Sequence, residues 1–367
     1  MKSIKKIVLT GGPCGGKTTS IQKIVEEFEE KNYKVIVVPE AATTLINMGI
    51  IPASLPTFEF QKRVLQLSQY YEKIAYENAT LYDKDVIIIC DRGALDGKAY
   101  IDKEGFEKLL KQFHITEDYL MSNYDLIIHL KTAADGKEEF YTLENNSART
   151  ETIEEARKKD QLTLNAWLGH SQLKIIGNDT NFEEKLNKVI FEIYNVLNKP
   201  FPIQTQHKFL VKKINLERLS SLKNIVKMNI EQYIEMDNNQ EKIYRKTIKD
   251  DILSYKLIIK TDTNINNERI RQEKNIYDFE YYNNTPSNKQ PIRKTRYCFE
   301  YYNQYFNLDI FDYGLTILEI DKINKNQPII LPDFIETYED ITDDISYRNG
   351  NIYAEKNKMM IIKKNNI

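Results

Sequence analysis

The sequence predicts two domains: an α/β domain with a parallel sheet, followed by an α+β domain that is mainly an antiparallel sheet. The chain has 367 residues, and domains average about 150 residues. In the first half, short and fully apolar runs alternate with helical patterns, which is typical of a parallel sheet covered on both faces. In the second half, apolar and polar residues alternate with a period of two, which is typical of antiparallel strands.

The first half contains five apolar runs that predict strands, with helical patterns before or after them. The expected sheet order is 2-3-1-4-5, with a helix following the first strand directly. The expected strands cover residues 7–9, 35–38, 86–89, 126–128 and 173–176, and the expected helices cover 18–31, 58–81, 153–167 and 182–197.

The change of pattern coincides with a proline pair. Pro200 and Pro202 end the last helical pattern and form a short, stiff connector. We therefore expect a first domain over residues 1–198, a linker over 199–204, a second domain over 205–355 and a frayed, charged tail over 356–367. Within the second domain, strands are expected over 208–212, 243–247, 256–260, 269–273, 292–296 and 315–321.

Composition excludes several classes of protein. The formal net charge is -2, which does not favour binding to long nucleic acid. The three cysteines match no zinc-binding pattern. No apolar run approaches the roughly 20 residues of a membrane-spanning helix. A soluble, cytoplasmic protein without nucleic-acid partners is therefore expected.

The clearest chemical motif is a phosphate-binding loop between the first strand and the first helix. Gly11 to Thr18 matches G-x-x-x-x-G-K-[ST] at every fixed position. In such a loop backbone N–H groups surround the phosphates, Lys17 reaches the β- and γ-phosphates, and the Thr18 hydroxyl is a Mg²⁺ ligand. ATP and GTP both remain open. The expected nucleotide-binding residues are Gly11, Gly12, Pro13, Cys14, Gly15, Gly16, Lys17, Thr18 and Thr19.

Four further residues are candidates for catalysis together with Lys17. Asp91 ends the third strand, where it can ligate Mg²⁺ or cap a turn. Arg92 beside it can face an acceptor. Glu40 ends the second strand and is a general base, a group that positions water, or a carboxylate at a helix start. Arg149, favoured over Arg157, fits a lid that closes on the phosphates.

The motifs resemble those of known families. Leu9 to Pro13, Cys90 to Gly93, Arg149 to Glu151 and Ala166 to His170 resemble the P-loop domain shared by nicotinamide riboside kinases and the TRPL-translocation-defect GTP-binding family. The second half resembles a CYTH domain, the barrel of triphosphate tunnel metalloenzymes. The matching segments are Tyr255–Lys260, Ile292–Tyr297, Leu308–Phe311, Gly314–Asp321 and Ile341–Asp344, the last together with Tyr347 and Asn349. The TRPL-type family joins these two domains in this order.

The resemblance implies a charged barrel interior, with several departures from the family pattern. Ile243 stands where the family usually has a first arginine, and Arg271 stands where it usually has a glutamate. Gln204 and Gln206 stand where catalytic tunnel enzymes carry metal-binding glutamates. Glu319 and Asp321 remain as possible metal ligands on one strand face. Glu273 is a further acidic candidate. The inward-facing cations expected to bind anions are Lys208, Arg245, Lys260, Arg269, Lys294 and Arg296.

Three functions follow from these features. The first is an enzyme that hydrolyses a Mg²⁺-bound nucleoside triphosphate or transfers its phosphoryl group to a small acceptor. The second is a nucleotide-gated protein whose basic barrel binds a phosphoinositide, polyphosphate or other phosphorylated ligand. The third is a triphosphatase in the barrel, which the two glutamines disfavour.

Overall fold

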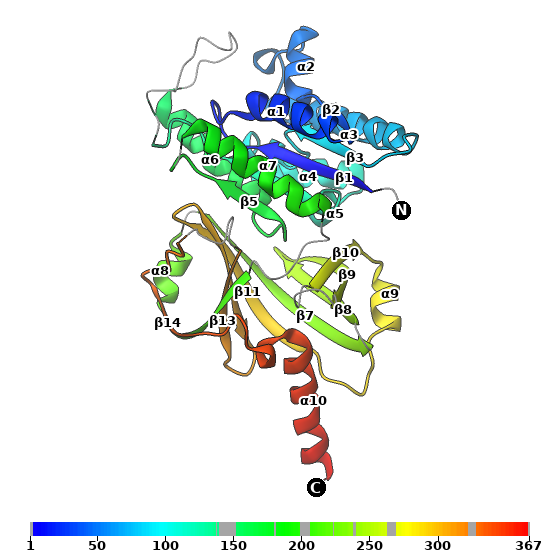
Figure 1. Cartoon of the computed structure of the whole chain (residues 1–367), viewed down its shortest axis with the longest axis vertical. Coiled ribbons are helices and arrows are strands. Elements are labelled where there is room, and N and C mark those ends of the chain that lie inside the picture. The colour runs from blue at the N-terminus through cyan, green and yellow to red at the C-terminus, as the bar shows by residue number, and fades with distance from the viewer. Residues whose placement is uncertain are drawn as a thin grey trace. The chain divides into compact units, whose positions relative to one another are not determined.

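A computed structural model gives the fold as two compact units, residues 1–198 and 199–367. The structure describes residues 3–136, 138, 152–179, 181–198, 206–222, 224–237, 240–262, 269–321 and 328–365. The predicted linker and Arg149 lie outside these residues. Figure 1 shows an α/β unit and a separate β-rich unit.

The first unit is built on a five-stranded parallel sheet in the order β2-β3-β1-β4-β5, which is the predicted order. Each strand coincides with one of the predicted apolar runs. Because all five strands are parallel, their carboxyl ends lie along one edge of the sheet. The strands are β1 (Ile4–Thr10), β2 (Lys34–Val38), β3 (Val86–Asp91), β4 (Leu126–Leu130) and β5 (Leu173–Ile176).

Helices cover both faces of this sheet. The right-handed crossovers place α1 and α7 on one face and α3 and α4 on the other, and the members of each pair contact each other. The helices are α1 (Lys17–Glu30), α2 (Ala41–Asn47), α3 (Thr57–Ala79), α4 (Lys103–Phe113), α5 (Glu117–Ser122), α6 (Ile153–Trp167) and α7 (Phe182–Asn198), with a short 3-10 turn η2 (Asp96–Ala99) after β3.

Burial explains why the strands are mainly apolar. Every residue from Val86 to Cys90 is fully buried, and Ile7 to Leu9 are fully buried as well. Side chains on both sheet faces therefore leave water, which is the main driving force for this arrangement.

The second unit is an antiparallel sheet in which described residues form nine strands in the order β10-β9-β8-β7-β11-β12-β13-β6-β14. This agrees with the predicted barrel-like antiparallel domain. The strands are β6 (Gln206–Ile214), β7 (Ile225–Asp237), β8 (Gln240–Lys249), β9 (Ile252–Asp262), β10 (Arg269–Asn275), β11 (Ile292–Tyr301), β12 (Gln304–Phe311), β13 (Thr316–Asp321) and β14 (Ile335–Asp340).

Two apolar clusters stabilise this sheet, one on each face. The first includes Ile243, Ile258 and Ile292, and α10 (Asn349–Asn365) adds Ile352 and Tyr353 to it. The second lies on the other face of β11, β12, β13 and β6. It includes Phe299, Phe306 and Phe334, and α8 (Leu216–Ser220) adds Leu219. A third helix, α9 (Asp278–Asn283), lies beside β8 and β9.

The structure adds elements that the sequence pattern did not predict. Strand β12 was not among the predicted strands, although apolar and polar residues alternate from Phe306 to Ile310 and almost the whole strand is buried. Strands β7 and β14 were also not predicted. Residues 356–365, which were expected in a frayed tail, belong to the helix α10. The helix starts against the apolar core, and a nucleated helix propagates cheaply. None of the described helices combines the length and apolarity needed to cross a membrane.

Candidate nucleotide site and charged barrel interior

The P-loop joins β1 to α1 at the carboxyl edge of the parallel sheet. Gly11 has φ 129°, and a Cβ there would lie 2.1 Å from the carbonyl oxygen of Leu130. Gly16 precedes α1 with φ 89°. Both positions therefore require glycine, since any side chain would clash or strain the backbone. Thr18 and Thr19 in the first turn of α1 are exposed.

Lys17 lies over the loop that it belongs to. Its Nζ donates to the carbonyl oxygens of Gly12 at 2.9 Å and Gly11 at 3.2 Å. Burial, and then the neighbouring Arg92, lower the pKa of Lys17 from 10.5 to about 8. An ammonium group that is poorly compensated by its surroundings is well suited to bind a phosphate anion.

Asp91, Arg92 and Glu40 meet beside the P-loop, because β3 is next to β1 and β2 follows β3 on the same side of the sheet. Arg92 Nε donates to Glu40 Oε1 at 2.7 Å, and Arg92 Nη1 lies 3.4 Å from the Gly11 carbonyl oxygen. Burial opposes the charge of Glu40, but Arg92 and then Thr43 lower its pKa below the usual value. Glu40 is therefore an anionic partner of Arg92 in this structure.

Asp91 has a different environment from Glu40. Its Oδ1 is buried and has no hydrogen-bond partner among the described residues. Burial raises the pKa of Asp91, although Lys17 opposes the shift. A carboxylate oxygen held beside a P-loop without a protein partner is a suitable ligand for a hard cation such as Mg²⁺.

Two buried carboxylates at the site were not among the sequence candidates. Asp96 on η2 accepts hydrogen bonds from Thr10 Oγ1 at 2.7 Å and Trp167 Nε1 at 2.6 Å, and its Oδ2 lies 3.7 Å from Arg92. Burial raises the pKa of Asp96. In the sequence, Asp96 is marked only by its position shortly after Asp91 and Arg92.

The second carboxylate, Asp160 on α6, holds the P-loop in place. Its Oδ1 accepts from the backbone N–H of Gly12 at 2.8 Å and of Thr132 at 3.1 Å. Burial opposes its charge, but His129 and Lys131 more than compensate and lower the pKa of Asp160 to about 2. The interaction joins residues 148 positions apart, so no local pattern could have indicated it.

The β4–β5 side of the P-loop is held by Asn178. Its Nδ2 donates to the carbonyl oxygens of Thr132 and Asp135, and its Oδ1 accepts from Lys185 Nζ at 2.7 Å. Thr132 Oγ1 in turn donates to the Pro13 carbonyl oxygen. Arg157 on α6 donates to the carbonyl oxygen of Ala134 at 2.7 Å. These contacts fix the loop after β4 against the P-loop.

In the second unit, several predicted cations face shared carboxylates. Arg296 makes two hydrogen bonds of 2.6 Å to Asp309, and Lys294 Nζ contacts the same carboxylate at 2.5 Å. Glu319 accepts from Arg296 at 2.9 Å and lies 3.1 Å from Lys208 Nζ. Lys208, Lys294 and Arg296 thus share the two carboxylates of Asp309 and Glu319. Asp309 was not among the acidic residues that the sequence analysis placed in the interior.

Charges in this network depend on each other. Burial lowers the pKa of Lys294 to about 8 even though Asp309 raises it. Burial disfavours the charge of Glu319, but Lys208 and Arg296 hold its pKa well below the usual value. Glu319 is thus an ion-pair partner here. The side chains of Asp321 and Arg269 lie outside the described residues.

The other predicted cations also have polar neighbours. Arg245 donates to the buried Gln232 at 3.3 Å, and Lys260 lies 3.9 Å from the buried Glu241. Among the described residues no group of three or more His, Cys, Asp or Glu side chains could hold a metal ion. The described part of the interior is thus a network of mixed charge.

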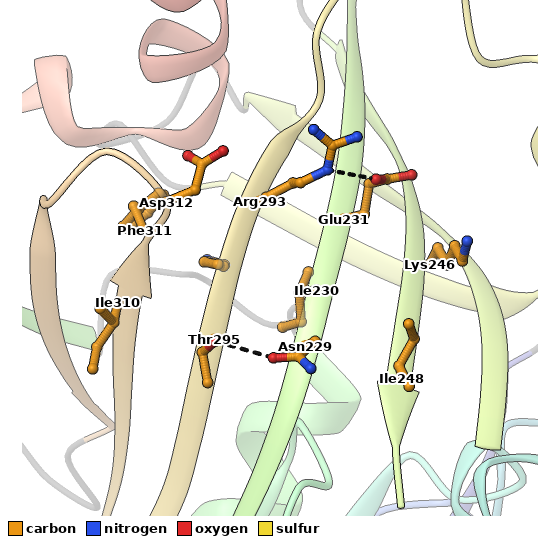
Figure 2. Close-up of a pocket in the computed structure, with 11 residues that line it drawn as sticks. Asn229, Ile230, Glu231, Lys246, Ile248, Arg293, Thr295, Ile310, Phe311 and Asp312 are labelled. Atoms are coloured by element: carbon orange, nitrogen blue, oxygen red, sulfur yellow. Dashed lines mark hydrogen bonds and ion pairs between the residues drawn. The ribbon is translucent and has the colours of Figure 1, made fainter. Parts of the chain in front are cut away.

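The opposite face of β7, β8, β11 and β12 carries a hollow of about 510 Å³ (Figure 2). Arg293 points across it to Glu231 at 2.8 Å, and Thr295 donates to Asn229 at 3.0 Å. These side chains alternate with Lys294 and Arg296 along β11 and so point away from the charged network. The hollow is open and of mixed charge.

Comparison with known proteins supports the assignment of the first unit. The model of an AAA domain family matches residues 6–185. No curated protein matches the chain. Among solved structures, the inorganic triphosphatase NE1496 is 20% identical, with a TM-score of 0.30 over 41% of this chain and 93% of its own. A second structure, titled hypothetical protein NE1496, has 20% identity and a TM-score of 0.29, and covers 41% and 97%.

These likenesses to solved structures are too weak to carry an argument about the second unit. The resemblance to the TRPL-translocation-defect family also stays a resemblance, because none of the comparisons tests it. The match to the AAA domain family model and the P-loop geometry agree, and together they identify the first unit as a P-loop nucleotide-binding domain of AAA type.

Proposed function

We propose that the first unit binds a Mg²⁺-bound nucleoside triphosphate, ATP or GTP, and transfers its γ-phosphoryl group to water or a small acceptor. One observation carries the proposal. The strand order brings Lys17, Asp91, Arg92 and Glu40 together at the carboxyl edge of the sheet. Phosphoryl transfer requires a cation for the phosphates, a carboxylate for the metal and charged groups that orient the acceptor. Lys17, Asp91 and the Arg92–Glu40 ion pair can supply these parts.

The residues present fit Mg²⁺ at this site. Asp91 supplies a buried carboxylate oxygen without a protein partner among the described residues, and Thr18 supplies a hydroxyl in the first turn of α1. When bound, the ion would neutralise charge on the β- and γ-phosphates. Lys17 would add a second positive charge from the loop side.

The remaining residues orient the reaction. Arg92 is held by Glu40 and by the Gly11 carbonyl oxygen, so its guanidinium is positioned before substrate binds. In the proposal, Arg92 stabilises the negative charge of the transferring group or its acceptor. Glu40, anionic and hydrogen-bonded to Thr43, either keeps Arg92 in place or accepts a proton from the attacking hydroxyl. Arg149, whose placement the structure does not describe, stays a candidate for a lid.

For the second unit we propose binding of a phosphorylated small molecule without catalysis. Lys208 on β6 and Lys294 and Arg296 on β11 face the same two carboxylates, and the three cations carry more charge than Asp309 and Glu319 remove. Those two carboxylates are committed to ion pairs, which disfavours a metal-dependent triphosphatase. The substitution Lys208→Ala should weaken binding of tripolyphosphate or inositol phosphate to this unit. An unchanged titration would reject this part of the proposal.

The enzymatic proposal can be tested by following phosphate. Purified protein would receive ATP or GTP with Mg²⁺, with and without nicotinamide riboside and a panel of nucleosides. Release of phosphate alone would indicate an NTPase, and a phosphorylated acceptor would indicate a kinase. Tight nucleotide binding without turnover would favour the nucleotide-gated binding protein instead.

A further inference from the structure

An exposed aromatic ring lies against the end of the P-loop. Phe182 is the first residue of α7, and 47% of it is exposed. A Cβ placed on Gly16 would lie 2.6 Å from the Phe182 Cε2 atom and 3.1 Å from its Cζ atom. The ring edge therefore touches the loop at the residue before Lys17. Only a glycine leaves room for it.

The start of α7 holds this ring in position. Asn181 Oδ1 accepts from the backbone N–H of Glu184 at 2.9 Å, and Asn181 Nδ2 donates to the Glu184 carboxylate at 3.1 Å. These bonds cap the first turn of the helix. Phe182 thus has a fixed position, and one apolar face of its ring is exposed to water.

The strand order separates two sides of the phosphate site. Asp91, Arg92 and Glu40 come from β3 and β2, on one side of β1, whereas Phe182 follows β5 on the other side. We therefore expect the γ-phosphate and the acceptor on the β2–β3 side, where the groups suited to phosphoryl transfer lie. The nucleoside has the β4–β5 side available, where the aromatic ring lies.

The Asn178 side chain on that side is already used. Asn178 Nδ2 donates hydrogen bonds to the carbonyl oxygens of Thr132 and Asp135, and Asn178 Oδ1 accepts one from Lys185 Nζ. It supports the loop and is not left to read a base edge. An aromatic face, in contrast, binds any base by stacking.

We propose that Phe182 is the platform on which the nucleobase stacks, and that it contributes affinity for ATP and GTP alike. This inference rests on the nucleotide site of the proposed function. It assigns the nucleoside to the β5 side of the P-loop and the acceptor to the β2–β3 side.

Titration calorimetry on the full chain tests this with three Mg²⁺-bound ligands: ATP, GTP and inorganic tripolyphosphate. Lys17→Ala measures binding that does not use the P-loop, and that background is subtracted. Phe182→Ala should raise the Kd for ATP and GTP about 5- to 150-fold, equivalent to about 1–3 kcal/mol. It should leave the Kd for tripolyphosphate unchanged, because the inorganic ligand has no base.

Two variants serve as controls. Phe182→Tyr keeps an aromatic face and should bind nucleotide like the wild type. Phe191→Ala removes another exposed phenylalanine of the same helix, about 13 Å further along its axis, and should change nothing.

Each other outcome has a defined meaning. Equal weakening for ATP and tripolyphosphate would show that Phe182 merely supports the loop, and unchanged ATP binding would show that the base lies elsewhere; both overturn the inference alone. If the wild-type chain binds none of the three ligands at the P-loop, the proposed function fails and this inference fails with it.

Discussion

Replacing Asp309 by Asn should destabilise the second unit and leave the first unchanged. The Asp309 side chain is 2% exposed and accepts from both Lys294 and Arg296. Asparagine keeps the volume but removes the charge, so that two cations remain buried with only Glu319 nearby. Loss of one partner from a buried ion pair costs about 3–5 kcal/mol.

The cost of this substitution should fall as pH rises. The pKa of Lys294 is already lowered to about 8, mainly by burial, whereas an unfolded lysine has its usual value of 10.5. Without Asp309, the folded-state pKa would fall further. The unfolded state then binds more protons over a wider pH range, so that stability of the variant increases with pH more than that of the wild type.

Urea unfolding can separate the two units. Trp167, the only tryptophan, is in the first unit, so its fluorescence follows that unit, while far-UV circular dichroism follows both. With an m-value of about 2 kcal/mol/M, the dichroism transition of the second unit should shift by about 1.5–2.5 M. The fluorescence transition should not move.

A matched control uses an exposed carboxylate of the same strand end. Asp312 pairs with Lys356 at 3.1 Å and is 39% exposed, so Asp312→Asn should cost no more than about 1 kcal/mol. If Asp309→Asn is no less stable than Asp312→Asn, the network does not hold the barrel interior together.

Three further predictions concern the P-loop. Nucleotide affinity should decrease as pH rises above about 8, because Lys17 then loses its proton, and Lys17→Arg should abolish this dependence in fluorescence titrations. Gly11→Ala should abolish nucleotide binding and lower the melting temperature, since its Cβ would overlap the Leu130 carbonyl oxygen; normal binding would contradict the loop geometry. Asp160→Asn should cost about 2 kcal/mol at pH 7. Its folded-state pKa of about 2 lies below the usual 3.8, so this stability is present above pH 3.8 and is lost as pH falls through 2; a wild-type unfolding midpoint that is constant over that range would contradict the assignment.

Local patterns were sufficient for the parallel sheet and for the P-loop. Fully apolar strands and the loop with Lys17 depend on residues close together in the chain, so the sequence displays them directly. Asp160 could not be found this way, because its partner Gly12 is remote in sequence and the contact forms only when α6 packs.

The barrel interior shows the same limit. Alternation placed Lys294 and Arg296 on one strand face, but the partner of both is Asp309 on β12. Apolar and polar residues alternate along that strand, but the alternation alone does not show that Asp309 lies opposite Arg296. Strand register, which sequence periodicity does not give, decides which charges neutralise each other.

The central claim is that the first unit transfers the γ-phosphoryl group of a bound Mg²⁺–nucleoside triphosphate. Its most direct test measures nucleotide binding and nucleoside diphosphate formation for the wild type and Asp91→Asn, with the acceptor panel present. Wild-type turnover that depends on Mg²⁺, together with nucleotide binding but at least about 100-fold slower turnover in Asp91→Asn, is the predicted result. Equal turnover in both proteins, or tight binding without turnover in the wild type, would contradict it.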